Sequence, residues 1–519
     1  MKLTCSLCRL VLGTLLFSCT TTVSVAQERD TVQTKSGLIS GIFNPKTYVS
    51  SFKGIPYARA PLAALRWKAP QPALAWEGVK DCTAFGASPY QNKPGPFSMW
   101  SSEFIIPEQP ISEDCLYLNV WKGQVSKRLK PVVVWIYGGG FGSGGANAPI
   151  YDGEAMAGKG VVFVSFNYRV GIFGFMAHPE LSVESGHQAS GNYGLMDQIA
   201  ALKWVKANIE TFGGDPDQVT IAGQSAGSMS VTCLMASPAA KGLFNKAIAE
   251  SGALVMSHTG IAELRAAEKQ GQEIARTLQA RSIAELRNLP AAALQKVSAG
   301  FRPVVDGYIM PEAVGDCFAA GRQHKVYLLT GWNGDEVYVA DSLKAEDFKA
   351  KLKRQYGDKA AVILNYLQVT TDEDAARAQQ FMATAERYGM QNFTLANLHS
   401  AIPRMPVYVY RFKRKVPGQG EYAKFGAFHT AEVPYVFHNL SQSERSWQAA
   451  DLMLEKEMSD CWVNFILTGN PNQSYGNQWP PYQRNNPQVR IFDQQISTAA
   501  LAEREVLQVI VAAARAKAP

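Results

Sequence analysis

Continuous apolar runs recur along the middle and C-terminal parts of the chain. They occupy residues 132–136, 161–166, 219–222, 247–249, 326–329 and 407–410. Runs without polar alternation are typical of strands that are covered on both faces, as in parallel sheets. Helical patterns lie between them; in the segment 196–209, for example, apolar residues recur at helical spacing. Strands that alternate with helices predict a doubly wound α/β sheet.

The chain before residue 130 has a different pattern. Residues 50–57 and 115–121 are predicted to form antiparallel strands, and the segment 88–113 is a long loop rich in proline and aromatic residues. Residues 261–294 and 345–387 have amphipathic helical patterns. Long insertions of this kind often cover an active site. Because no repeat or linker divides the chain, residues 27–519 are expected to form one domain.

The N-terminus has the pattern of a secretory signal peptide. Lys2 and Arg9 precede an apolar stretch at 10–17, and small residues follow. This order predicts a signal peptide over residues 1–26 and an exported protein, periplasmic or extracellular. The residues that end at Cys19 also resemble a bacterial lipoprotein box, so a lipid anchor at Cys19 is the alternative. No later apolar run is long enough to predict a transmembrane helix.

Composition adds little about partners. Hydrophobic residues make up 46% of the chain and charged residues 18%, which predicts a large buried core. The net charge of +7 is spread over 51 basic and 44 acidic residues. No run of like charges stands out, so neither a nucleic-acid partner nor a membrane partner is predicted.

The segment Gly223-Gln224-Ser225-Ala226-Gly227 matches G-x-S-x-G. It follows a predicted strand and opens a predicted helix, which is the context of a nucleophile elbow. The turn is so tight that side chains on either side of the serine would clash, and the serine backbone is strained. Ser225 is therefore the predicted nucleophile.

A run of three glycines, 138–140, directly follows the predicted strand 132–136. Glycines there leave backbone N–H groups uncovered, and such groups stabilise the negative charge that builds up on oxygen when a carbonyl is attacked. We expect Gly139, Gly140 and Ala226, which follows the serine, to form this oxyanion hole.

The base and the acid of a catalytic triad follow the serine along the chain. His399, His429 and His438 fit this order, and His429 is favoured because it lies in a loop just past a strand. The predicted acid follows the strand 326–329, where the local pattern does not choose between Asp335 and Glu336. Its task is to hold the imidazole in one tautomer and to stabilise the imidazolium.

At this point the chain resembles the type-B carboxylesterases, a family of the α/β-hydrolase superfamily that includes cholinesterases and bacterial para-nitrobenzyl esterases. The matching blocks run through most of the mature chain, at 52–58, 65–67, 112–120, 138–141, 167–169, 191–198 and 212–216, and include the elbow. The resemblance implies a mostly parallel central sheet flanked by helices, with N-terminal antiparallel strands and helical insertions over the active site.

The resemblance also assigns residues. The family acid lies in a segment like G-x-N-x-D-E-G, which selects Glu336, although Val337 stands where glycine is usual. The family histidine lies in a segment like F-H-x-x-E, which selects His429. Ser251 matches a family serine near the acid and is expected to hydrogen-bond to Glu336. Gln224 stands where animal cholinesterases carry glutamate, which weakens any expectation of a cationic substrate.

Further implications concern the loop 88–113 and its surroundings. Arg66 and Glu113 match a structural ion pair of the family. The family also closes a loop with a disulfide between two early cysteines. Cys115 matches one of them, but Pro89 stands where its usual partner would be. We therefore expect a disulfide between Cys115 and Cys82, the only nearby alternative. The remaining mature cysteines, at 233, 317 and 461, are expected in the core. Trp100 and Phe141 are candidate residues of the substrate gorge.

These residues predict a secreted serine esterase that acts on a small-molecule ester. No H-E-x-x-H motif occurs, so neither a metal nor an organic cofactor is predicted. One alternative keeps the mechanism but cleaves an amide or a specialised ester. The other is a non-catalytic binding protein of cholinesterase-like fold, which the three intact candidate residues disfavour.

Overall fold

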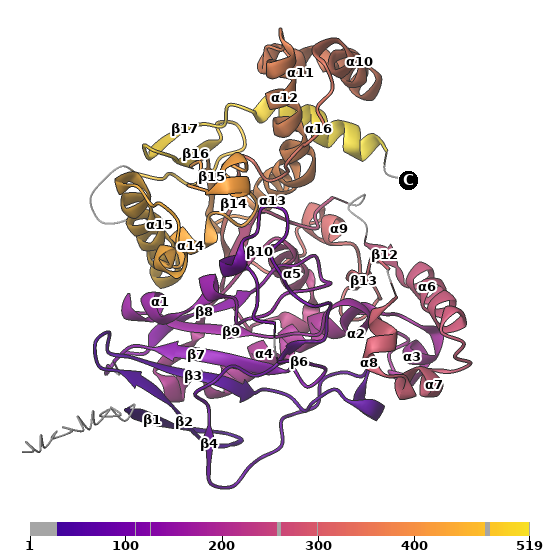
Figure 1. Cartoon of the computed structure of the whole chain (residues 1–519), viewed down its shortest axis with the longest axis vertical. Coiled ribbons are helices and arrows are strands. Elements are labelled where there is room, and N and C mark those ends of the chain that lie inside the picture. Colours follow the sequence, from indigo (N-terminus) through magenta and orange to yellow (C-terminus); the bar gives the residue numbers. More distant parts are fainter. Residues whose placement is uncertain are drawn as a thin grey trace, which may run out of the picture.

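Six parallel strands lie side by side at the centre of one large sheet, in the order β9-β8-β10-β11-β14-β15 (Figure 1). In the computed structural model their bounds are β8 (Lys130–Ile136), β9 (Val162–Phe166), β10 (Gly214–Gln224), β11 (Lys246–Glu250), β14 (Tyr327–Asn333) and β15 (Val407–Phe412). Each strand contains most or all of one predicted apolar run, and nearly all the apolar residues of these runs are buried. The prediction of a parallel α/β sheet is confirmed.

The structure describes residues 28–517, except for 109, 125, 257–260, 298 and 473–477. The predicted signal peptide therefore lies outside the described residues. No helix in the described part of the chain is long and apolar enough to cross a membrane.

Antiparallel strands extend the sheet at its N-terminal edge, as predicted. The strands are β1 (Arg29–Thr34), β2 (Gly37–Asn44), β3 (Val49–Pro56) and β7 (Tyr117–Lys122), and β7 joins them to β9. β4 (Val79–Asp81) pairs with β2, and β5 (Ser88–Pro89) and β6 (Ile111–Ser112) form a separate two-stranded sheet. β16 (Gln488–Phe492) continues the parallel order beside β15. An antiparallel strand, β17 (Ser497–Ala500), closes the far edge.

Helices lie between and after the parallel strands. They are α1 (Glu154–Gly158), α2 (Gly171–Phe175), α3 (Pro179–Glu184), α4 (Tyr193–Asn208), α5 (Ala226–Ala236), α9 (Val314–Ala319), α13 (Met390–His399), α14 (Val433–Val436), α15 (Ala449–Thr468) and α16 (Arg504–Ala516). Among them, α1, α4, α5, α13 and α15 contact the sheet. Helix α5 contacts β8, β10 and β11, so the residue that links β10 to α5 lies over the middle of the sheet.

Two helical insertions extend away from the sheet. The first holds α6 (Leu264–Thr277), α7 (Ile283–Asn288) and α8 (Ala291–Gln295), with the two-residue strands β12 (Ala262–Glu263) and β13 (Val304–Val305). The second holds α10 (Ala345–Tyr356), α11 (Ala360–Leu367) and α12 (Asp372–Thr384). Figure 1 shows α10–α12 projecting at one end of the molecule, apart from α6–α8.

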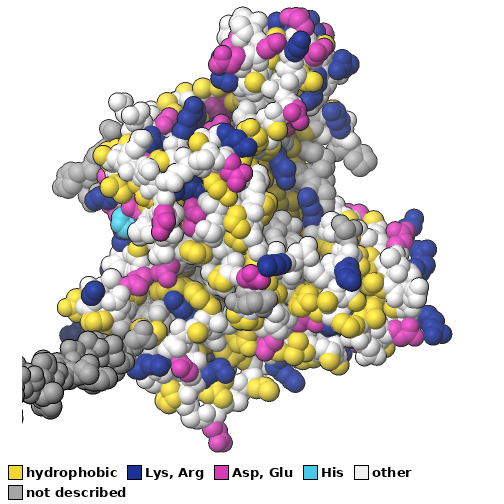
Figure 2. Space-filling model, viewed as in Figure 1, with side chains coloured by type: hydrophobic (Ala, Val, Ile, Leu, Met, Phe, Trp, Pro, Cys, Tyr) yellow, Lys and Arg dark blue, Asp and Glu magenta, His cyan; other side chains and the backbone are white. Residues whose placement is uncertain are grey.

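The space-filling view is hollowed between these two helical groups (Figure 2). Basic and acidic side chains are interspersed over the face in view, without a large area of one sign. This mixed surface agrees with the small net charge of +7 for so long a chain.

The predicted disulfide is absent: Cys82 and Cys115 are both free and buried. The main chain of Cys82 lies between two strands, where it bonds to Ser40 and Lys53. Cys115 instead lines a small cleft together with Pro89. The prediction of a bridge is wrong, because the main chain holds Cys82 between two strands, whereas Cys115 lines a cleft to which Cys82 does not contribute.

A buried ion pair fixes the first insertion to the N-terminal region, as the resemblance implied. Arg66 binds Glu113 through two hydrogen bonds of 2.7 and 2.5 Å. The same guanidinium donates to the carbonyl oxygens of Leu286, Arg287 and Leu289. The Arg66 side chain therefore supplies hydrogen-bond donors to the carbonyl groups at the end of α7 and links this helix to the loop before β7.

Candidate active site

Ser225 lies in the tight turn between β10 and α5, with φ 58° and ψ −122°. Such a backbone conformation is sparsely populated and costs about 1–3 kcal/mol. A Cβ on Gly227 would lie 1.9 Å from the Ile136 oxygen, and one on Gly223 would lie 2.5 Å from the Gly227 carbonyl carbon. The two glycines therefore let the turn close, and the Ser225 N–H donates to Glu250 O (2.9 Å), which ties the strained turn to β11.

The glycine run lies directly beside Ser225. A Cβ on Gly138 would lie 3.0 Å from Ser225 Cβ, so the run can approach the serine only as glycine. Gly139 and Gly140 have φ of 108° and 63° and line the same cavity as Ser225. Ala226 is the first residue of α5, where N–H groups have no acceptor within the helix. The three residues predicted to form an oxyanion hole are thus grouped around the serine.

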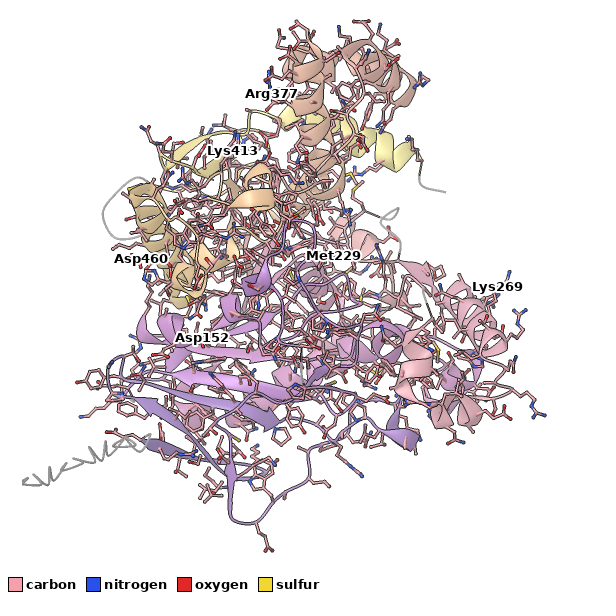
Figure 3. All side chains as sticks on the ribbon, viewed as in Figure 1. Asp152, Met229, Lys269, Arg377, Lys413 and Asp460 are labelled. Carbon is pink, nitrogen blue, oxygen red and sulfur yellow. The ribbon has the colours of Figure 1, made fainter. Side chains whose placement is uncertain are left out.

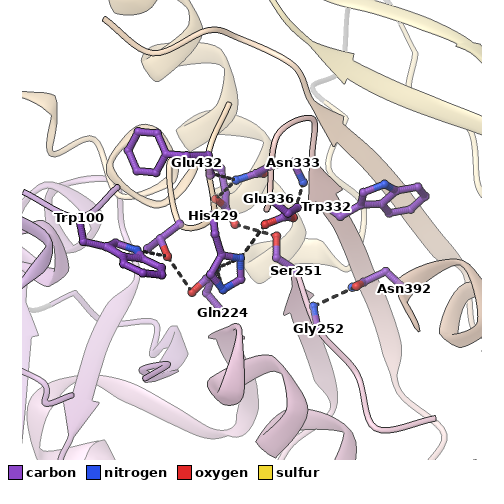
Figure 4. Close-up of polar contacts among 12 residues, drawn as sticks. Trp100, Gln224, Ser251, Gly252, Trp332, Asn333, Glu336, Asn392, His429 and Glu432 are labelled. Carbon is purple, nitrogen blue, oxygen red and sulfur yellow. Dashed lines mark hydrogen bonds and ion pairs between the residues drawn. The ribbon is translucent and has the colours of Figure 1, made fainter. Parts of the chain in front are cut away.

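His429 and Glu336 are joined by a 2.6 Å contact between Nδ1 and Oε2, and both are almost fully buried (Figure 4). A carboxylate only accepts hydrogen bonds, so Nδ1 carries the proton and Nε2 keeps a free electron pair. The Asn333 N–H donates to the other Glu336 oxygen at 2.6 Å. Glu336 is thus held by its own loop while it contacts the imidazole.

The two candidate acids have different partners. Asp335 Oδ2 accepts from the Ala427 N–H (2.9 Å) and so holds the loop that carries His429. Glu336, rather than Asp335, contacts the ring. Val337 has no positive φ, so this loop does not require the glycine that is usual in the family.

Aromatic and amide groups surround the imidazole. The Tyr388 ring stacks on His429 with centroids 4.4 Å apart, and Trp100 approaches edge-on at 6.1 Å. Trp100 Nε1 donates to Thr430 Oγ1, which in turn donates to Gln224 Oε1 at 3.3 Å. Gln224 Nε2 lies 3.3 Å from both ring nitrogens. In the described part of the chain no hydrogen bond joins Ser225 Oγ to His429.

Ser251 has a different partner from the one expected. Its hydroxyl donates to Glu432 Oε1 at 3.3 Å, not to Glu336. Glu432 is the glutamate of the F-H-x-x-E segment, and its second oxygen accepts from Asn333 Nδ2 at 2.5 Å (Figure 4). The expectation for Ser251 is wrong, because its hydroxyl is bound to Glu432 instead of Glu336.

Glu432 and Glu250 form a buried acidic pair behind the site, and both are 0% exposed. Burial, and then the nearby Glu250 and Glu336 charges, raise the pKa of Glu432 well above its usual value. Burial likewise raises the pKa of Glu250, whose Oε1 accepts from Trp462 Nε1 at 2.6 Å. Both pKa shifts favour the neutral forms of Glu432 and Glu250.

A cavity of about 450 Å³ contains both Ser225 and His429. Besides the glycine run, its lining residues include Phe97, Trp100, Phe104, Gln224, Ser225, Arg387, Tyr388, His429 and Thr430. Trp100 therefore lines the cavity as expected. Phe141, expected there too, is instead 1% exposed and packs edge-on against Phe175, because its φ of 64° turns the chain into the core.

A second, larger cavity of about 660 Å³ holds none of the predicted catalytic residues. It is lined around Trp67, Tyr193 and Met196. Among the described residues no group of three or more His, Cys, Asp or Glu side chains is arranged to hold a metal ion.

The sequence did not reveal Tyr388 or Arg387 as parts of the site. Both lie in a π-helical turn, Ala385–Gly389, which links the second insertion to α13. The insertion 345–387 is predicted from the sequence to lie over the active site, and Arg387 at its end does line the cavity. No periodicity marks the turn itself, although π-helical turns are frequent at functional sites.

Comparisons with known proteins agree with this geometry. The model of the carboxylesterase family matches residues 28–508. A fumonisin B1 esterase of Sphingopyxis macrogoltabida is 36% identical, covering 92% of this chain and 90% of that protein. A para-nitrobenzyl esterase of Bacillus subtilis is also 36% identical, covering 90% and 95%. A solved PNB esterase structure superposes with a TM-score of 0.79 at 33% identity, covering 93% of this chain and 99% of that one.

Proposed function

Since this chain belongs to the carboxylesterase family and is a carboxylic ester hydrolase, we propose that it works through an acyl-enzyme on Ser225. His429 is the general base and acid, and Glu336 orients it. The observation that carries the proposal is the 2.6 Å contact between His429 Nδ1 and Glu336, in the same cavity as the strained serine.

The first half of the reaction follows from this arrangement. His429 Nε2 takes the hydroxyl proton of Ser225 as its oxygen attacks the ester carbonyl carbon. The N–H groups of Gly139, Gly140 and Ala226 stabilise the oxyanion; one such donor contributes about 3–4 kcal/mol in other hydrolases. His429 then gives its proton to the leaving alcohol, and the acyl group remains on Ser225.

The second half repeats these steps with water. His429 takes a proton from the water that attacks the acyl-enzyme, and returns it to Ser225 as the acid product leaves. Throughout, Glu336 keeps the proton of Nδ1 in place and stabilises the imidazolium. Tyr388, stacked on the ring, and Gln224, beside it, restrict the imidazole to this orientation.

The substrate is a separate question. The two relatives of equal identity are named for fumonisin B1 and for a para-nitrobenzyl ester, so family membership does not choose among esters. We propose a small-molecule ester. An amide or a specialised ester under the same mechanism is the second candidate.

Hydrolysis of p-nitrophenyl esters from acetate to palmitate, by the wild type and Ser225→Ala, tests the mechanism. Loss of the serine should lower kcat by at least about 10⁴-fold, because the nucleophile and its base act as one unit. Circular dichroism checks that the variant is folded. A folded wild type without turnover, or a Ser225→Ala variant with full turnover, would refute the serine mechanism.

We further propose that the protein is exported, on the strength of the charged and then apolar residues at its N-terminus. Cell fractionation with N-terminal sequencing of the mature chain tests this. A chain that starts near Gln27 in the exported fraction is expected. Lipid attached to Cys19 would support the anchored alternative, and an uncleaved cytoplasmic chain would exclude export.

A further inference from the structure

The charged side chains on the wall of the catalytic cavity are of one sign. Arg387 and Lys93 line the cavity, and no Asp or Glu side chain does so among the residues the structure describes. Glu336 and Glu432 lie behind the imidazole and are 2% and 0% exposed. A substrate in the cavity therefore meets positive charge and no negative charge.

The two cations differ in their availability. Lys93 is already bound to Glu108, with Nζ 2.8 Å from the carboxylate, and both are largely exposed. Arg387 is exposed and lies over the Tyr388 ring, with its guanidinium carbon 5.5 Å from the centroid. Within the described part of the chain, no acidic side chain pairs with Arg387. Its charge is thus not neutralised by the protein.

Arg387 is also close to the reacting groups. The Tyr388 ring that it covers stacks directly on His429. Burial raises the pKa of Tyr388 to about 12, and the positive charges of Arg387 and Arg302 oppose this rise. The positive charges of Arg387 and Arg302 therefore both act on the phenol of Tyr388, which packs on the His429 imidazole.

We propose that Arg387 selects esters that carry a second, ionised carboxylate group, which the guanidinium binds while Ser225 attacks the ester. A guanidinium presents paired N–H donors that match a carboxylate, and such charge-assisted bonds are stronger than neutral ones. The absence of acidic side chains from the described cavity wall favours the same substrates. This inference rests on the ester hydrolysis proposed above and narrows its substrate class.

The test compares mono-4-nitrophenyl adipate with its methyl ester, which has the same chain without the charge. A second pair, 4-carboxyphenyl hexanoate and its methyl ester, places the carboxylate on the alcohol side. We expect the wild type to have a higher kcat/KM on the charged member of at least one pair. Arg387→Gln should lower kcat/KM for that substrate about five- to ten-fold, mainly through KM, and less than about two-fold for its methyl ester.

Arg377→Gln is the matched control, because it removes one exposed arginine charge elsewhere. Figure 3 shows Arg377 in the projecting helices, away from Met229, which lies one turn after Ser225. It should change neither rate. Arg387→Lys, which keeps the charge but not the paired donors, should retain part of the preference.

Two results would overturn the inference: equal kcat/KM for charged and neutral members of both pairs in the wild type, or an equal loss on both members in Arg387→Gln. In either case, Ser225-dependent hydrolysis of the methyl esters would show that the proposed esterase mechanism still holds. If the folded wild type hydrolysed neither member of either pair, the proposed function itself would fail.

Discussion

The candidate site depends on a few side chains whose surroundings give each one a single task. Glu336 accepts from an amide and from the imidazole, so both of its oxygens are in use. Asn333, whose N–H binds Glu336, also donates through Nδ2 to the buried carboxyl group of Glu432. Glu250, buried nearby, accepts from Trp462. Burial raises the pKa of both groups, which favours their neutral form.

Glu250→Gln tests this arrangement through the pH dependence of stability. A folded pKa above the unfolded one favours the folded state at low pH; that advantage is complete below the unfolded pKa and is lost as pH rises through the folded pKa. Glutamine does not titrate. Between about pH 5 and pH 8, wild-type unfolding free energy should therefore fall relative to the variant by at least about 1 kcal/mol.

Urea unfolding of both proteins across this pH range measures the effect. Glu273→Gln, on the exposed face of α6, serves as the control and should follow the wild type. Parallel curves for wild type and Glu250→Gln would show that Glu250 has an ordinary pKa in the folded protein.

At the scale of elements, the elbow joins β8, β10 and α5 at distances that only glycine permits. The strained φ of Ser225 persists because the strand before it and the helix after it are both packed. Helix α5 can follow so closely because Gly227 lies against the carbonyl group of Ile136, at the end of β8. Three elements thus fix the position of Ser225, the proposed nucleophile.

Gly227→Ala should therefore destabilise the protein by about 3 kcal/mol or more, since its methyl group would overlap backbone that cannot move easily. Gly158→Ala is the matched control. It also lies in a helix, and a Cβ there would meet nothing within 4 Å, so its effect should stay below about 1 kcal/mol. Thermal melts of both variants compare the two sites; equal melting temperatures would contradict the steric account of the elbow.

At the scale of the whole molecule, buried arginines join segments that are far apart in sequence. Arg66 links the loop before β7 to the first insertion, as described above. Arg169 binds Asp197 through two hydrogen bonds of 2.7 Å and so joins the loop after β9 to α4. Arg411 in β15 binds Glu503, just before α16, at 2.6 Å and so joins the C-terminal helix to the sheet. Each pair satisfies charges that would otherwise be costly to bury.

Arg66→Ala should lower the unfolding free energy by about 3–5 kcal/mol, because it leaves Glu113 and the carbonyl groups at the end of α7 without a donor. Arg281→Ala, which removes an exposed side chain just before α7, should cost less than about 1 kcal/mol. Guanidinium unfolding measures both. A small effect of Arg66→Ala would mean that water replaces the guanidinium and that the link is not structural.

Several features could be predicted from the chain alone because they depend on local pattern. The apolar runs predicted the parallel strands, since burial on both faces leaves no polar alternation. The glycines around Ser225 and at 138–140 predicted close approach of backbone, and the structure contains those approaches. Chain order narrowed the choice of histidine, but it took family resemblance to select Glu336 over Asp335.

Other features were decided only by the tertiary structure, because they depend on which distant segments meet. Ser251 binds Glu432, Cys115 and Cys82 are both free, and Phe141 is buried in the core. Tyr388 and Arg387 are at least 41 residues away in sequence from any other residue that lines the cavity, and they lie in a π-helical turn that no periodicity marks. Local pattern determines elements; the contacts between their ends, where this chemistry lies, are determined by packing.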